Sequence, residues 1–186
     1  MLSVLRLGHR LQRDFRVTTH CGLVARAFGA DRIFIAGDYD EKLITRIKKI
    51  VERFGGPFYV DYVNNWISLV KTHKETYGIV VHLTMYGQKL LPVLEILRPR
   101  LWQDSILIVV GAGKVPGEIF TLADYNVAVT NQPHSEISAL AVFLDRLQGG
   151  NELDKTFKNA KIKIVPTARG KCLERSKDPN EFRVGL

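Results

Sequence analysis

Residues 105–117 have the sequence SILIVVGAGKVPG, an apolar run followed by a turn that contains three glycines and one proline. Five consecutive apolar residues, from Ile106 to Val110, are typical of a strand covered on both faces, as in a parallel sheet. Glycine lets the backbone after such a strand approach a ligand or another chain segment closely. This stretch therefore predicts a buried strand followed either by a ligand-binding loop or by a tight structural turn.

The glycine-rich turn departs from two familiar nucleotide-binding motifs. The dinucleotide fingerprint requires glycine at its sixth position, where this chain has Pro116. A Walker A loop requires serine or threonine after its lysine, but Lys114 is followed by Val115. These differences count against a nicotinamide-dependent oxidoreductase and against a nucleoside triphosphatase.

Apolar runs alternate with amphipathic segments along the rest of the chain. Asp40 is a typical N-cap residue, Thr18 or Thr19 can cap the first helix, and Gly149-Gly150 can end the last one. The expected strands cover residues 4–7, 32–37, 58–63, 78–83, 105–110, 126–130 and 161–165, and the expected helices cover about 18–28, 40–54, 66–71, 90–97 and 135–147.

This alternation predicts an α/β fold with a mostly parallel sheet and helices on both faces. We expect a single domain over residues 1–186, in which about 150–186 form a basic extension with one extra strand. Three expected strands end in turns, at 83–87, 111–117 and 130–135. Since ligands of parallel sheets bind at the carboxyl ends of the strands, these turns predict the ligand site.

The positive charge lies at the two ends of the chain. The net charge is +8, of which residues 1–32 and 151–186 carry +4 each, while residues 33–150 are neutral. Lysine and arginine release condensed counterions when they bind a phosphate backbone, which favours association. The excess at the N-terminal end consists of arginine, whose guanidinium binds phosphate bidentately, so the charge favours a nucleic-acid partner.

Cysteine and histidine give little sign of redox or metal chemistry. Cys21 and Cys172 lie far apart and outside any metal spacing, which predicts no disulfide, no metal site and a reducing, cytoplasmic compartment. His73 and His82 are expected to be structural, and His134 either faces a ligand or belongs to a helix cap. No apolar run reaches the ~20 residues that span a bilayer, so no membrane association is expected.

Several motifs together resemble one family. They are RLGHR (6–10), RD-x-R-x-x-TH (13–20), ARAFGA (25–30), the long stretch 109–146 and KIKIVPTARGK (161–171). These motifs are similar to those of the archaeal tRNA cytidine-56 2'-O-methyltransferases, which belong to the knotted SPOUT superfamily. The resemblance covers nearly the whole chain.

The resemblance implies a fold, a reaction and partners. The chain is expected to form a C-terminal deep trefoil knot, to use S-adenosylmethionine, and to methylate a ribose 2'-oxygen of tRNA, at cytidine 56. It also implies a homodimer in which the partner completes the pocket. The helix at 135–147 suits such an interface, but its apolar stripe would equally pack into its own core. The alternative function is an RNA-binding module of similar fold without catalysis.

The three turns are the implied cofactor site. Their backbone groups would hydrogen-bond the adenine and ribose of S-adenosylmethionine, and their apolar side chains would contact the ring. The implied cofactor-binding residues are Leu83, Thr84, Gly111, Ala112, Gly113, Lys114, Val115, Val129, Thr130, Asn131, Gln132, His134, Ser135, Glu136 and Ile137.

The wider family also implies catalytic residues in the first helix. His20 takes the position of a family asparagine, and Arg26 keeps the family's arginine at the same spacing. Arg26 would stabilise the developing alkoxide, and the alternative is a solvated helix arginine. The proton acceptor is open between His20, a phosphate and water. Arg10, Arg13 and Arg16 are expected to bind RNA phosphates.

The chain departs from the wider family at two loop positions. Glu136 stands where the family has asparagine, shortly before Ser138. Lys114 follows Gly113 where a glutamate is common, so Glu118 is the only acid of that loop. These departures weaken any transfer of family roles to Glu118, Glu136 and Ser138.

Overall fold

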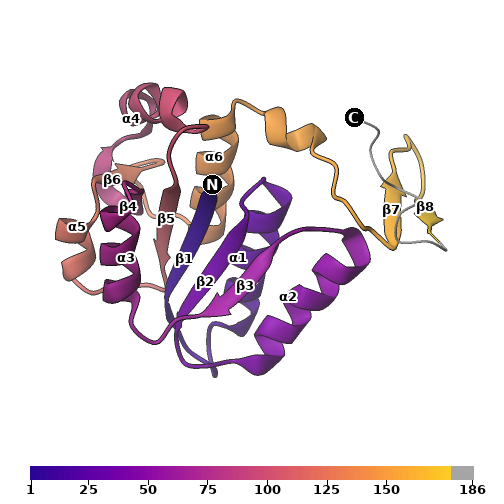
Figure 1. Cartoon of the computed structure of the whole chain (residues 1–186), viewed down its shortest axis with the longest axis horizontal. Helices are drawn as coiled ribbons and strands as arrows, with labels where there is room; N and C mark the ends of the chain where they lie inside the picture. Colours follow the sequence, from indigo (N-terminus) through magenta and orange to yellow (C-terminus); the bar gives the residue numbers. More distant parts are fainter. Residues whose placement is uncertain (177–186) are drawn as a thin grey trace.

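A six-stranded sheet forms the centre of the structure, a computed structural model that describes residues 1–176 (Figure 1). The strand order is β3-β2-β1-β5-β4-β6, and every pair of neighbouring strands is parallel, as predicted. The strands are β1 (Leu2–His9), β2 (Arg32–Gly37), β3 (Tyr59–Tyr62), β4 (Ile79–Lys89), β5 (Ile106–Gly111) and β6 (Tyr125–Ala128).

Helices cover both faces of the sheet, which confirms the predicted α/β class. Apolar side chains of α1, α2, α4 and α6 form one core layer, and those of α3 and α5 form the layer on the other face. The helices are α1 (Phe15–Ala27), α2 (Glu41–Phe54), α3 (Trp66–Glu75), α4 (Leu90–Leu97), α5 (Glu118–Leu122) and α6 (Glu136–Gln148), with the 3-10 turns η1 (Arg98–Arg100) and η2 (Asn151–Asp154). Within residues 1–176, no helix has the length and apolar character needed to span a bilayer.

The apolar run of β5 is explained by its central place. Ile106, Ile108 and Val110 belong to the layer beneath α1 and α6, whereas Leu107 and Val109 belong to the layer beneath α3. Side chains alternate between the two faces of a strand, so both sets must be apolar when both faces are covered. The continuous pattern therefore reports burial on both faces.

The predicted threonine cap of the first helix is wrong. The helix α1 begins at Phe15, because the Asp14 carbonyl already accepts a hydrogen bond from the Thr18 backbone. The Thr18 hydroxyl contacts His9 of β1, and the Thr19 hydroxyl donates to the Phe15 carbonyl. Both hydroxyls are therefore used inside the helix and cannot cap its start.

The Asp40 cap and the end of α6 at Gly149 follow the prediction, and Ser135 is a further cap that was not predicted. The Asp40 carboxylate accepts from the Leu43 backbone at 3.0 Å and begins α2. The Ser135 hydroxyl accepts from the Ile137 backbone, and Gly149 ends α6 in the left-handed region at φ +68°. Such ends depend on neighbours in sequence, which makes them predictable.

The tail contains a hairpin that was predicted only in part. Strand β7 (Ile162–Val165) pairs antiparallel with β8 (Cys172–Arg175), which was not predicted; nor was the short helix α5. The hairpin lies apart from the sheet, near the end of α2 (Figure 1), where the Lys161 backbone donates to the Arg53 carbonyl. This hydrogen bond joins the start of the hairpin to α2.

The chain after β4 lies tightly across β6. Strand β4 continues beyond the predicted end at Leu83, since Gln88 also pairs with Val127 after residues 84–87 leave the register. The Asn131 side-chain amide donates to the Met85 carbonyl at 2.8 Å and to the Gly87 carbonyl at 3.2 Å. The expected trefoil knot stays a prediction.

Replacing Gly87 with alanine tests this close approach. A Cβ atom at Gly87 would stand 2.5 Å from the backbone of Asn126 and Val127, so Gly87→Ala should lower the free energy of unfolding by about 2 kcal/mol. Gly117→Ala is the matched control, because Gly117 has a helical backbone and no heavy atom of residues 1–176 lies within 4 Å of its added Cβ. Urea unfolding measures both; equal midpoints for the two variants would contradict the packing described.

Candidate active site

The three predicted ligand loops lie side by side at one edge of the sheet. The first loop, 83–87, interrupts β4, and the other two follow β5 and β6. These three strands are neighbours in the sheet and run parallel, so the loops lie at the same edge. The contact of Asn131 with the Met85 and Gly87 carbonyls joins the first loop to the third. The structure thus brings together the segments expected to bind the cofactor.

The second loop is shaped by two glycines. A Cβ atom at Gly111 would stand 1.9 Å from Cγ1 of Val115, so the turn closes only over glycine. Gly113 has φ +75°, and no heavy atom of the described chain lies within 4 Å of a Cβ built there. The side of the loop at Gly113 is therefore open, and its backbone is accessible to a ligand.

The predicted cofactor residues provide both apolar and polar surface. Leu83 and Ala112 are buried; Thr84, Gly111, Val115, Val129, Glu136 and Ile137 are partly buried; and Gly113, Lys114, Thr130, Asn131, Gln132, His134 and Ser135 are exposed. Apolar side chains beside accessible backbone groups suit a flat ring that carries a polar sugar. These residues fit the adenosyl cofactor implied by the sequence.

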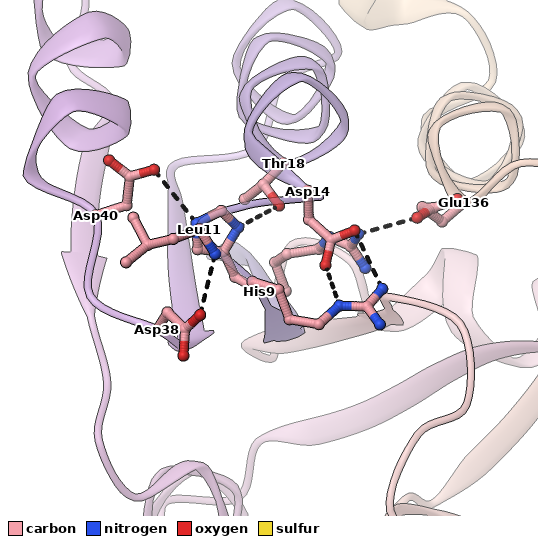
Figure 2. A network of polar contacts seen from close by, with 9 residues as sticks. His9, Leu11, Asp14, Thr18, Asp38, Asp40 and Glu136 are labelled. Atoms are coloured by element: carbon pink, nitrogen blue, oxygen red, sulfur yellow. Dashed lines mark hydrogen bonds and ion pairs between the residues drawn. The ribbon is translucent and has the colours of Figure 1, made fainter.

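A buried ion pair lies at the end of the third loop, and Figure 2 shows its carboxylate, Glu136. The partner, Arg6, is paired in register with Val110 at the end of β5, and its side chain is fully buried. Its Nη2 atom donates to Oε1 of Glu136 at 2.9 Å, which connects β1 to the first residue of α6. The pair thus joins the end of the third loop to the middle of the sheet.

Three further polar residue pairs lie around the start of α1 (Figure 2). His9 is buried, with Nδ1 at 2.9 Å from the Thr18 hydroxyl and Nε2 at 3.4 Å from Oδ2 of Asp40. Arg10 binds both carboxylate oxygens of Asp14, at 2.7 and 3.2 Å, and these hydrogen bonds hold the pKa of Asp14 below its usual value. These contacts join β1, α1 and α2 and leave His9 out of reach of a substrate.

Arg26 lies away from the loops. It stands in the last turn of α1, and its guanidinium donates to the Phe54 carbonyl at 2.7 Å and to the Gly55 carbonyl at 2.7 and 3.2 Å. It also stacks 4.0 Å from the Phe157 ring, and burial lowers its pKa. These contacts bind the last carbonyls of α2 and argue against the predicted catalytic role of Arg26.

The structure does not bring His20 and Arg26 together. His20 is on the exposed face of α1, four residues after Arg16, whereas Arg26 is on the buried face. Arg13 and Arg16 are exposed near the start of α1, close in sequence to the carboxyl end of β1. Arg10 is exposed as well, although Asp14 engages its guanidinium. The predicted phosphate-binding arginines are therefore accessible to RNA.

The remaining titratable residues have structural surroundings. His82 contacts the Asn126 side chain at 2.8 Å, and His73 contacts the Ile79 carbonyl at 3.3 Å, so both are structural, as expected. Burial raises the pKa of the Cys21 thiol to about 12, which excludes a thiolate nucleophile there, and Cys172 is exposed and free. Within residues 1–176, no three metal-ligating side chains gather in one place.

Sequence reasoning did not identify the Arg6–Glu136 pair. A signal was present, because Arg6 interrupts an apolar strand at the centre of a sheet that must be buried. Buried charges require a partner, so Arg6 indicated a carboxylate nearby. Glu136 is 130 residues away, and only the folded structure brings the two side chains together.

Solved structures of methyltransferases share this fold. The A. aeolicus TrmH/SpoU tRNA modifying enzyme matches with a TM-score of 0.57 and 15% identity, over 81% of this chain and 75% of that chain. The SpoU methyltransferase AviRb from Streptomyces viridochromogenes, in complex with AdoMet, matches with a TM-score of 0.55 and 13% identity, over 79% of this chain and 56% of that chain. The fold is that of the SPOUT class of methyltransferases.

Sequence comparison identifies the family. The family described as "tRNA ribose 2'-O-methyltransferase, aTrm56" matches residues 54–174. A tRNA (cytidine(56)-2'-O)-methyltransferase of Methanopyrus kandleri is 54% identical over 172 residues, 92% of this chain and 95% of that protein. One from Pyrococcus horikoshii is 56% identical over 172 residues, 92% of this chain and 83% of that protein. The chain belongs to the tRNA ribose 2'-O-methyltransferase family, which confirms the resemblance seen in the motifs.

Replacing Arg26 tests its structural role. Arg26→Met removes the donors to the Phe54 and Gly55 carbonyls, so the free energy of unfolding should fall by about 2 to 4 kcal/mol. Arg16→Met, on the exposed face of the same helix, should change it by less than about 0.5 kcal/mol. Urea unfolding measures both, and activity is compared per folded molecule. An Arg26→Met protein as stable as the wild type but inactive would restore a catalytic role for Arg26.

Proposed function

We propose that this chain transfers the methyl group of S-adenosylmethionine to the ribose 2'-hydroxyl of cytidine 56 in tRNA. The observation that carries the proposal is the similarity to tRNA (cytidine(56)-2'-O)-methyltransferases over nine tenths of the chain. The accessible loops at the carboxyl edge of the sheet support it, because they lie where a parallel sheet binds its ligand.

The three loops are proposed to hold the cofactor. Leu83, Val115 and Ile137 would contact the adenine ring, and the open backbone of Gly113 and its neighbours would hydrogen-bond the polar groups. When bound, S-adenosylmethionine supplies a methyl group on a positively charged sulfur. The remaining tasks of the chain are to place the ribose hydroxyl, to take up its proton and to exclude water.

Arginines at the start of α1 and the basic tail are proposed to bind the RNA backbone. Arg13 and Arg16 are exposed, and Arg10 adds a charge beside them. The tail presents a second group of exposed basic residues, which are Lys155, Lys158, Lys161, Lys163, Arg169, Lys171 and Arg175. On this proposal, the positive charge at both ends of the chain binds one partner, tRNA.

A cytoplasmic homodimer is proposed as the assembled enzyme. The apolar stripe of α6 packs into its own core through Leu140, Phe143 and Leu144, so it is not free to form an interface. Exposed apolar side chains remain on α4, at Leu91 and Ile96. These residues offer a surface for a second copy, and light scattering that gives the mass of one chain would contradict the dimer.

Methyl transfer to tRNA tests the proposed function directly. Purified protein is incubated with S-adenosylmethionine labelled with tritium on the methyl group and with unmodified tRNA, followed by nucleoside mapping. Label at the ribose 2'-oxygen of cytidine 56 is the expected result, and tRNA with that 2'-hydroxyl replaced by hydrogen is the matched control. Label on another nucleotide would support methyl transfer to tRNA but contradict cytidine 56 as the target. RNA binding with neither label nor cofactor binding would favour a non-catalytic RNA-binding module.

Salt dependence tests the proposed phosphate contacts. Each arginine that neutralises a phosphate should contribute about 0.7 to 0.9 to the slope of log K against log salt concentration. Arg13→Ala and Arg16→Ala should therefore weaken tRNA binding and make the slope shallower by about that amount each. Fluorescence anisotropy at several salt concentrations measures the slope, with Lys48→Ala on the exposed surface of α2 as control. A slope equal to that of the wild type would remove Arg13 and Arg16 from the interface.

A further inference from the structure

Arg6 is a fixed positive charge beneath the proposed reaction site. Its side chain is 0% exposed, and its Nε and Nη1 atoms have no hydrogen-bond partner among the described residues. Arginine stays protonated in proteins, so this charge cannot be removed and must be compensated by nearby carboxylates. Its direct partner is Glu136, and its charge also helps to lower the pKa of Asp14 after the stronger effect of Arg10.

Glu136 is both fixed and accessible. Arg6 holds its Oε1 atom at 2.9 Å, while 27% of its side chain remains exposed. Its second carboxylate oxygen takes part in no hydrogen bond within residues 1–176. Glu136 directly follows Ser135 of the third loop, so this oxygen lies next to the proposed cofactor residues. A carboxylate with one oxygen fixed and the other free suits the acceptance of a proton from a bound hydroxyl.

The other candidate proton acceptors fit less well. His9 is buried between Thr18 and Asp40, and the Asp14 carboxylate is occupied by Arg10. His20 lies on the exposed face of α1, and His134 is exposed beside its own backbone. Glu136 differs from each of these residues, because it is fixed by one contact and still reachable.

We propose that Glu136 accepts the proton of the ribose 2'-hydroxyl and that Arg6 is the residue that positions it. The inference rests on the proposed function and names the residue that takes up the proton. In the step, a bond forms between the 2'-oxygen and the methyl carbon while the methyl–sulfur bond breaks and leaves its electron pair on sulfur. The hydroxyl proton passes to the free oxygen of Glu136 and from there to solvent.

Glu136→Gln is the decisive variant. Glutamine keeps the size of the side chain and an oxygen that can accept from Arg6, but it cannot take up a proton, so kcat should fall by about 100-fold or more. The dissociation constants for S-adenosylmethionine and tRNA should stay within about threefold of the wild type, because the loop keeps its contact. Glu41→Gln is the matched control, since Glu41 is the corresponding first residue of α2 and is exposed. Glu41→Gln should retain full activity.

The outcomes separate this inference from the proposed function. A wild-type protein without methyl transfer would contradict the proposed function itself. A wild type that is active, with Glu136→Gln within threefold of its kcat, would overturn the role of Glu136 alone. Weaker cofactor binding with unchanged kcat in Glu136→Gln would also overturn the role of Glu136 as proton acceptor. Glu136 would then only maintain the conformation of the loop.

Arg6→Lys tests the positioning role. Lysine keeps the charge but lacks the planar fork, so kcat should fall by about tenfold while the protein remains folded. Combined with Glu136→Gln, the substitution should add little further loss, because both changes act on one proton acceptor. Effects that multiply in the double variant would show that Arg6 acts independently of Glu136 and would overturn the positioning role. Thermal unfolding of each variant verifies that the comparison is made on folded protein.

Discussion

Burial of the parallel sheet on both faces is the constraint from which the site follows. The strand β5 is covered by helices on each side, so its residues from Ile106 to Val110 are all apolar and inaccessible. Each parallel neighbour requires a connection that returns across a face, which places all carboxyl ends at one edge. The loop that interrupts β4 and the loops after β5 and β6 therefore meet at this edge, where Asn131 also joins the first loop to the third.

Arg6 places a charge inside this apolar core, so the stability of the fold depends on a contact that Arg6 makes at the site. Replacing the water around a guanidinium costs several kcal/mol unless hydrogen bonds and a counter-charge take its place. Glu136 supplies the counter-charge and one hydrogen bond, to Nη2, and it belongs to the first turn of the helix that follows the third loop. The contact that makes the buried charge tolerable also fixes the loop, so core packing and loop geometry depend on the same pair.

Features set by neighbours in sequence were predictable. The apolar strand β5, the Asp40 cap and the left-handed Gly149 follow from pattern and local hydrogen bonding, and the structure has each of them. The start of α1 was missed because the Thr18 hydroxyl finds a partner on β1 rather than at the helix end. The extension of β4 to Lys89 was missed because it pairs with β6, which lies almost forty residues further on.

Arg6 and Arg26 show how position along a strand or helix sets the distance of a residue from the ligand loops. A helix that connects two parallel strands runs back from the carboxyl edge, so each turn carries its residues about 5.4 Å further away. Arg26 comes eleven residues after Phe15, which places it about 16 Å along α1 toward the opposite edge. Arg6 pairs with the end of β5 and is therefore at the site from the start. In a parallel α/β fold, the distance of a residue along the chain from the end of the preceding strand therefore decides whether it can reach the ligand loops.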